Sequence, residues 1–166
     1  DNIIPSKLPK PILVPYAWTS NSKGEIFIGT RSSGVWKYSN GSFKKLADKK
    51  VLGQNFIRSL YYDNDNSLWI GTNGAGVAIY KDGKFKFINK STGLKSEFVA
   101  CIFKTKAGNY WIGTSGGGAS LADKDGTVIK TITEKEGLAS NIVSSIYEDE
   151  DGIVWISTGV FGLSRL

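Results

Sequence analysis

The segment YWIGT at Tyr110–Thr114 recurs three more times in this chain with little change. The other copies are IFIGT at Ile26–Thr30, LWIGT at Leu68–Thr72 and VWIST at Val154–Thr158. The fourth position of each copy falls at residues 29, 71, 113 and 157, so the intervals are 42, 42 and 44 residues. A second glycine follows five residues later in every copy: Gly34, Gly76, Gly118 and Gly162. Four copies in register at this period indicate a repeat protein.

Each repeat contains four short strand-forming segments, named strands A to D in chain order. Strand A is an apolar run such as Val143–Glu148, strand B carries the repeated motif, and strand C follows the second glycine. Strand D follows an Asn-Gly or Asp-Gly pair, which suits a two-residue hairpin because both turn residues need positive φ. These pairs are Asn40-Gly41, Asp82-Gly83 and Asp125-Gly126. β-Branched and aromatic residues dominate the strands, and no stretch has helical periodicity.

This pattern predicts an all-β fold, a β-propeller with four blades of four-stranded antiparallel sheet and no α-helix longer than about two turns. The blades span approximately residues 1–46, 47–88, 89–132 and 133–166 of a single propeller segment. The last repeat stops at strand C, whereas Asp1–Ile4 occupies the position of a strand D. The four blades either close on themselves or form half of a larger ring. We expect the larger ring, because bulky aromatics lie between the blades and an open arc would expose apolar faces.

The composition narrows the classes of function. The net charge is +6, but the lysines are scattered among turns and no nucleic-acid-binding signature accompanies them, so nucleic acid is not an expected partner. The single cysteine, Cys101, excludes an intrachain disulfide, and its alignment with small residues predicts a buried, inert thiol. No apolar run approaches the ~20 residues of a transmembrane helix, and Asp1 begins no signal peptide.

Catalytic chemistry has few candidates in this sequence. Histidine, the commonest general base and metal ligand, is absent. The glycine loops at residues 71–76 and 113–118 lack the lysine of a phosphate-binding P-loop. The acidic turns at Asp63–Asn66 and Asp149–Gly152 lack the further oxygen ligands of a calcium loop, and aspartate side chains that bond the turn backbone explain them better. We therefore expect no enzyme activity, no metal and no cofactor.

One tryptophan recurs at a fixed position of strand B, as Trp69, Trp111 and Trp155. Such a column could stack on sugar rings, or it could pack between blades with each indole N–H capped locally. The fixed strand position favours packing.

A family resemblance covers nearly the whole chain, and two segments match best: Thr92–Leu121 and Glu136–Leu166. Their pattern D-x-x-G-x-[LV]-W-[IV]-G-T-x-x-x-G-[VL], with GL-x-S-N between repeats, resembles the two-component regulator propeller repeat. The first repeat departs from it, since Phe27 replaces the tryptophan. The resemblance implies the periplasmic or extracytoplasmic sensor region of bacterial hybrid two-component histidine kinases, often ones that regulate carbohydrate use. A membrane span, a kinase and a receiver normally follow such repeats, and this chain contains none of them.

The candidate binding residues lie in two sets of loops that blade topology places on one face. The loops between strands B and C contribute Arg31, Asn73, Ser115 and Phe161, and the loops that join strand D to the next strand A contribute Asn55, Glu97 and Asn141. Loops on a rigid frame are the usual place for recognition. Amides, an arginine and an aromatic suit a carbohydrate or an anionic sugar. The alternative is that these are ordinary variable loop residues.

Three functions fit these observations. The first is a non-catalytic sensor segment that binds a small polar ligand or oligosaccharide, or transmits its binding. The second is an interaction scaffold that self-associates or packs against further propeller blades. The third is a propeller lectin, which predicts the same site in every blade, and the divergence among Arg31, Asn73, Ser115 and Gly159 argues against it.

Overall fold

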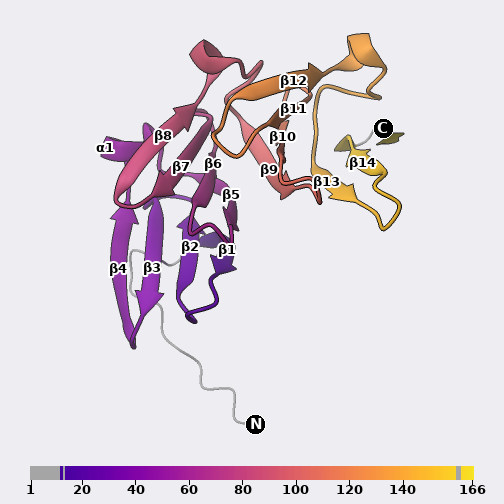
Figure 1. Ribbon diagram of the computed structural model, residues 1–166. Coiled ribbons are helices and arrows are strands. Elements are labelled where there is room, and N and C mark those ends of the chain that lie inside the picture. The colour runs from indigo at the N-terminus through magenta and orange to yellow at the C-terminus, as the bar shows by residue number, and fades with distance from the viewer. Residues whose placement is uncertain (1–11, 13, 160–161) are drawn as a thin grey trace.

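The computed structural model describes residue 12, residues 14–159 and residues 162–166. The described strands form four antiparallel sheets, one for each repeat, which stand side by side as blades 1 to 4 (Figure 1). Blades 1 to 3 have four strands each in the order A-B-C-D, and blade 4 has three described strands. The predicted all-β propeller class is confirmed. The predicted strand at Asp1–Ile4 lies outside the described residues.

The strands and helices have the following bounds. Blade 1 consists of β1 (Pro15–Ser20), β2 (Ile26–Thr30), β3 (Val35–Ser39) and β4 (Ser42–Ala47). Blade 2 consists of β5 (Ile57–Tyr62), β6 (Leu68–Thr72), β7 (Val77–Lys81) and β8 (Lys84–Ile88). Blade 3 consists of β9 (Val99–Lys104), β10 (Tyr110–Thr114), β11 (Ala119–Ala122) and β12 (Val128–Ile132). Blade 4 consists of β13 (Ser145–Glu148), β14 (Val154–Ser157) and β15 (Leu163–Arg165). The D–A loops contain the short helices α1 (Lys49–Leu52), η2 (Lys90–Thr92) and η3 (Glu134–Glu136).

Two of the three predicted hairpin turns have the expected geometry. Both residues of each pair have positive φ: Asn40 50° and Gly41 76°, Asp82 48° and Gly83 79°. The prediction at Asp125-Gly126 is wrong, because only Gly126 has positive φ there, at 78°. This turn is wider: the Asp123 amide donates to the Thr127 carbonyl at 2.9 Å. The Asp123 carboxylate in turn accepts from the Asp125 and Thr127 amides at 2.9 and 2.8 Å.

The glycine of the repeated motif makes room for the next blade. A Cβ atom on Gly71 would lie 2.7 Å from the Cγ1 of Val99, which begins strand A of blade 3. Gly29 has the same relation to Ile57, and Gly113 to Val143, each at 2.6 Å. Side chains never approach so closely, so glycine at this position lets adjacent blades pack against each other.

Adjacent blades share their hydrophobic cores. Strand A of each blade contacts strand A of the next, and these strands line the inner side of the arc (Figure 1). Between blades 1 and 2 the buried residues include Phe27, Val35 and Leu68. Separate clusters lie between blades 2 and 3 and between blades 3 and 4. Each blade is therefore held by its neighbours, as a repeat architecture requires.

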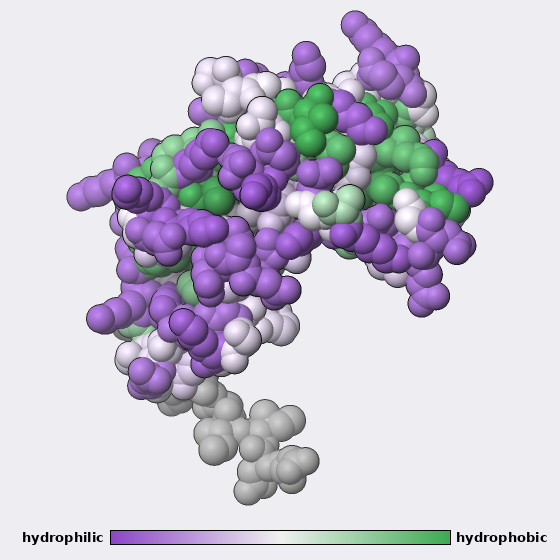
Figure 2. Space-filling view, viewed as in Figure 1, coloured by the Kyte–Doolittle hydropathy of each residue, from purple (hydrophilic) through white to green (hydrophobic). Residues whose placement is uncertain are grey.

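The arc is open, so the four blades do not close on themselves. Leu163 begins strand C of blade 4 and is 61% exposed, although the equivalent residues Val35 and Val77 are buried completely. At the other end Trp18 is 73% exposed, whereas the equivalent Leu60 packs against blade 1. In Figure 2 hydrophobic residues gather at the surface in the region of blade 4. Both terminal blades thus present an uncovered apolar face.

Candidate ligand-binding face

Backbone hydrogen bonds bring the B–C loops and the D–A loops together on one face. The amides of Gly74 and Gly76 donate to the carbonyl of Glu97 at 3.1 and 3.0 Å. The next junction repeats this, with Gly116 and Gly118 donating to Asn141 at 2.9 and 3.0 Å. At the first junction Gly34 donates to Asn55 at 3.1 Å. The two loop sets that blade topology places on one face therefore contact each other directly.

The three predicted residues of the D–A loops hold those loops in shape. The Asn55 side-chain oxygen accepts from the Lys49 amide at 2.8 Å, which caps the start of α1. Glu97 and Asn141 accept in the same way from the first residues of η2 and η3, at 3.2 and 2.9 Å. A side-chain oxygen at a helix start satisfies an amide that has no partner within the helix. These side chains are half-buried and fix the loop, and their contact with a ligand stays a prediction.

The predicted residues of the B–C loops are placed differently from one another. Arg31 is exposed, with its guanidinium carbon 5.7 Å from the ring centre of Phe56. The carbonyl of the half-buried Asn73 accepts from Gln54 at 3.2 Å. The Ser115 hydroxyl accepts from the guanidinium of Arg58 at 3.4 Å. Phe161 lies outside the described residues. Arg31 is thus the predicted residue whose charged group is most accessible on this face.

In each D–A loop an apolar side chain comes one position after the predicted residue. Phe98 and Ile142 are 49% and 50% exposed, and Phe56 is half-buried at the same repeat position. The residues that follow them, such as Val99, are buried. The alternation of an exposed and a buried apolar residue is the expected geometry of a strand. The sequence analysis did not single out these apolar side chains, and the repeated position was the signal that could have found them.

Two hollows lie on this face. One of about 540 Å³ is lined by residues that include Ser32, Lys45 and Asn55. The other, of about 520 Å³, is lined by residues that include Lys95, Thr133 and Asn141. Both combine basic, hydroxyl and amide groups, which suits a polar ligand.

A third hollow, of about 550 Å³, lies toward the opposite face, between the turns of blades 2 and 3. Lys81 and Asp65, which both line this hollow, form an ion pair at 2.8 Å. Burial opposes ionisation of Asp65, but hydrogen bonds from Lys81 and Ser67 outweigh it and lower the pKa of that carboxyl to about 2. Lys84 and Lys124 also line this hollow, and both are exposed. The mixed charges here belong to well-solvated turns.

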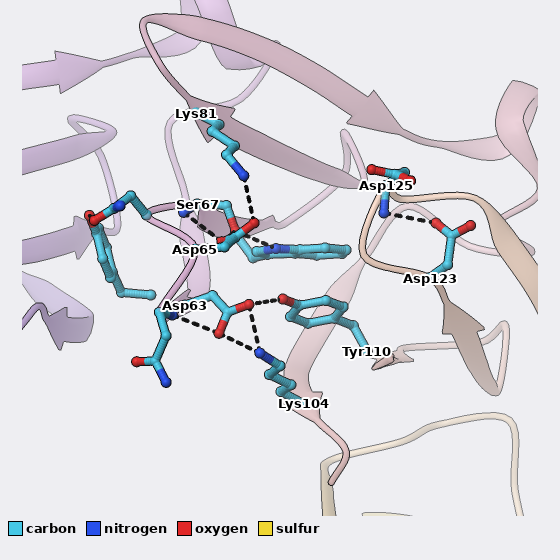
Figure 3. Close-up of polar contacts among 12 residues, drawn as sticks. Asp63, Asp65, Ser67, Lys81, Lys104, Tyr110, Asp123 and Asp125 are labelled. Carbon is cyan, nitrogen blue, oxygen red and sulfur yellow. Dashed lines mark hydrogen bonds and ion pairs between the residues drawn. The ribbon is translucent and has the colours of Figure 1, made fainter. Parts of the chain in front are cut away.

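A buried polar cluster lies beside that hollow and joins blades 2 and 3. Lys104 contacts both carboxylate oxygens of Asp63, at 2.6 and 2.8 Å, and the Tyr110 hydroxyl donates to the same carboxylate (Figure 3). Burial and the neighbouring Asp63 both raise the pKa of Tyr110. Burial alone would raise the pKa of Asp63, but the bonds from Lys104 and Tyr110 lower it. All three groups are satisfied by one another, so the cluster serves packing.

The cysteine thiol and the acidic side chains are the other candidate reactive or metal-binding groups. Burial raises the pKa of Cys101 to about 11, so its thiol stays protonated at neutral pH. Within the described residues no group of three or more His, Cys, Asp or Glu side chains is placed to hold a metal ion. Nor do the described residues include a helix long and apolar enough to cross a membrane.

Comparisons with known proteins agree with the repeat. The family model described as two component regulator propeller matches residues 51–74, 93–116 and 137–159, which confirms the resemblance predicted from the motifs. No curated protein matches the sequence.

Solved structures share the fold at low identity. The extracellular domain of BT4673 from B. thetaiotaomicron, described as a one component system, matches with a TM-score of 0.77 at 22% identity. That of BT3049, described as a hybrid two component system from the same organism, gives 0.54 at 21%. The alignments cover 92% and 97% of this chain but only 24% and 28% of those domains. A catalytically inactive virginiamycin B lyase from Staphylococcus aureus, solved with quinupristin, gives 0.73 at 16%, covering 96% of this chain and 57% of the lyase.

Proposed function

We propose, because this chain carries repeats of the two component regulator propeller family, that it is a non-catalytic segment of an extracytoplasmic sensor region. In this role the chain binds a small polar ligand or transmits its binding. Extracellular domains of two B. thetaiotaomicron regulators share its fold, which supports an extracytoplasmic location. The chain spans about a quarter of those domains, so sensing by a longer protein is part of the proposal.

The observation that carries the proposal is the match of three repeats to the regulator family. The lyase that shares the fold is an enzyme, and the chain must be distinguished from it. That lyase was made inactive by replacing a histidine, whereas this chain contains no histidine. A role in binding therefore accounts for the chain better than a lyase activity does.

The structure supports one face for the ligand. The B–C and D–A loops meet there on a rigid frame, two hollows open on it, and Arg31 is exposed. Carbohydrates are candidate ligands because hydroxyl-rich molecules need amides and charged groups for orientation and apolar surface for contact.

A ligand screen on the purified chain tests this proposal. Thermal unfolding would be followed with neutral oligosaccharides, acidic oligosaccharides, amino acids and short peptides. A ligand that binds only the folded state raises the Tm, and the rise continues as the logarithm of ligand concentration above the Kd. The effect should fall in Arg31→Gln and persist in Lys23→Gln, an exposed lysine in the A–B turn of the opposite face.

A second candidate, an interaction scaffold, is favoured by the uncovered faces of blades 1 and 4. If no compound in the screen changes the Tm while the chain associates through those faces, the scaffold replaces the sensor.

A further inference from the structure

The hollow between the turns of blades 2 and 3 is lined by four lysines and two aspartates. Blade 2 contributes Lys81, Lys84 and Lys86, and blade 3 contributes Lys124. Its volume of about 550 Å³ is in the range of small-molecule sites. We call it the basic hollow.

One lysine and one aspartate of the lining neutralise each other. The ammonium of Lys81 lies 2.8 Å from the Asp65 carboxylate, which also accepts from the Ser67 hydroxyl at 2.6 Å (Figure 3). This pair fixes one wall of the basic hollow. The charges that remain for a ligand are those of the other lining residues.

The other lysines have no carboxylate bound to them. Lys84, Lys86 and Lys124 are exposed, and they take part in none of the ion pairs found among the described residues. The second lining aspartate, Asp125, is also exposed and outside those pairs. Three positive charges therefore face one negative charge. A hollow lined mainly by one sign of charge attracts ions of the opposite sign.

The wide turn of blade 3 builds the second wall. Blades 1 and 2 join strand C to strand D by two-residue turns, whereas blade 3 does so through residues 123–127. The Asp123 carboxylate holds this turn by accepting from two of its amides. Gly126 packs on blade 2, because a Cβ atom there would lie 2.7 Å from the Cδ1 of Ile79. The departure from the repeat thus brings Lys124 to the lysines of blade 2.

The lining also offers apolar surface. Ile79 and Phe85 are its apolar residues, on strands β7 and β8. Ile79 is buried, and Phe85 is half-buried with its ring centre 4.8 Å from that of Tyr80. Side chains held on packed strands can contact a ligand with little loss of conformational entropy. The basic hollow therefore suits an anion that is attached to an organic body.

The use of lysine favours one kind of anion. An ammonium group is a compact point charge on a flexible stem, and it lacks the planar fork by which arginine matches a carboxylate. A phosphomonoester carries about 1.5 to 2 negative charges at pH 7 and three strong acceptor oxygens. Three lysines without carboxylate partners match one such group in charge and in hydrogen bonding.

We propose that the basic hollow binds a small organic phosphate. Lys84, Lys86 and Lys124 bind the phosphate oxygens, and the organic body contacts Ile79 and Phe85. The site lies toward the face opposite to the loops used in the proposed function. It therefore goes beyond that function and does not depend on it.

Calorimetry with four probes tests the proposal. Phenyl phosphate combines the phosphate group with an apolar ring, inorganic phosphate lacks the ring, and phenol lacks the anion. Phenyl sulfate keeps the ring but carries a single negative charge. We expect phenyl phosphate to bind about tenfold more tightly than each of the other probes, with an affinity that falls as salt rises.

Variants place the binding in the basic hollow. Lys84→Gln combined with Lys124→Gln should weaken phenyl phosphate by about tenfold, because two charge-assisted contacts are lost. Asp125→Asn should strengthen it severalfold, because a negative charge leaves the lining. Lys23→Gln combined with Lys135→Gln is the matched control, since both lysines are exposed and neither lines this hollow. The control should keep the wild-type affinity, and every variant should keep the wild-type Tm.

Four results would overturn the proposal. The first is equal binding of phenyl phosphate and inorganic phosphate, which would remove the organic body from the site. The second is equal weakening by the control pair, which would show attraction to net charge alone. The third is a loss of binding in Arg31→Gln, which would assign the phosphate to the opposite face. The fourth is no binding of phenyl phosphate at millimolar concentration. None of these results counts against the sensor proposal, which the ligand screen tests.

Discussion

The indole of Trp69 in β6 stacks on the phenol ring of Tyr110 in β10 of the next blade, with ring centres 3.8 Å apart and planes 17° apart. Both side chains are buried. The indole N–H donates to the Ser67 hydroxyl at 3.2 Å, and the Tyr110 hydroxyl donates to Asp63. Trp69 therefore packs between blades with its N–H capped, as the fixed strand position predicted, and Trp111 lies in the buried cluster between blades 3 and 4.

Replacing a buried tryptophan of this column should destabilise the fold through lost packing. We expect Trp111→Ala to lower the free energy of unfolding by about 3–5 kcal/mol. Trp155→Ala should cost clearly less, because Trp155 is only half-buried at the open end of the arc. Urea denaturation of both variants measures the difference. Equal losses would show that Trp155 is buried in solution.

The ion pair between Asp63 and Lys104 should also stabilise the contact between blades. The Asp63 side chain is buried, so Asp63→Asn leaves Lys104 without its partner and should cost on the order of 3 kcal/mol. Asp65→Asn is the matched control, because the Asp65–Lys81 pair is largely exposed and such pairs contribute little. A control variant as unstable as Asp63→Asn would contradict this assignment.

The same carboxyl gives a pH dependence of known sign. The pKa of the Asp63 carboxyl is lower in the folded state than in the unfolded state. Its contribution to folding stability is therefore fully present above the unfolded pKa, which is near 4, and is lost as pH falls through the folded pKa. Stability of the wild-type chain should therefore decrease below about pH 4. Denaturation at successive pH values should show a smaller decrease in Asp63→Asn. An identical profile in the variant would mean that other carboxyls dominate.

The motif glycine should tolerate no side chain where a following blade covers it. Gly71→Ala places a Cβ atom 2.2 Å from the Ser59 hydroxyl and 2.7 Å from Val99, so we expect a loss of about 1–3 kcal/mol. Ser157 occupies the same position in blade 4, and its hydroxyl bonds to Ser144 at 3.0 Å. Ser157→Ala should lower the free energy of unfolding less than Gly71→Ala does. Thermal unfolding of both variants measures the difference. The reverse order would contradict the packing argument.

The repeat register could be predicted from the sequence because packing between blades acts at the same position every time. The contact between adjacent blades requires a glycine at the position of Gly71 and a large apolar residue at the position of Trp69. Because this contact recurs in every repeat, the constant spacing of the motif reveals both positions. The wide turn at Asp123 was missed because a dipeptide signature says nothing of a carboxylate two residues before it. That carboxylate bonds the Thr127 amide and stabilises the longer loop.

The candidate site was only partly predictable. Thr133-x-x-Glu136 is a capping box, and its spacing shows that the following loop is built around a short helix. This motif would have suggested that the Asn141 side chain stabilises the loop and does not face a ligand. The contact between Asp63 and Lys104 joins residues 41 positions apart, and only the departure of Tyr110 from the aliphatic residues of other repeats gave a hint of it.

The last prediction concerns the uncovered faces of blades 1 and 4. Trp18 and Leu163 are 73% and 61% exposed at positions that are apolar and covered in the inner blades. Soluble monomers rarely leave such surface in contact with water, so we expect the isolated chain to self-associate at micromolar concentration. Trp18→Lys combined with Leu163→Lys should give a folded monomer by light scattering.

Ile129→Lys provides the matched control, because Ile129 is 55% exposed on the outer strand β12, away from both end faces. This variant should associate as the wild type does, since lysine on an outer edge strand disturbs neither terminal blade. If the wild-type chain is a compact monomer at micromolar concentration, the terminal faces do not associate, and further blades of a longer protein are then the partners that would cover them. If all three chains associate equally, contact occurs elsewhere on the surface and the end faces are not responsible.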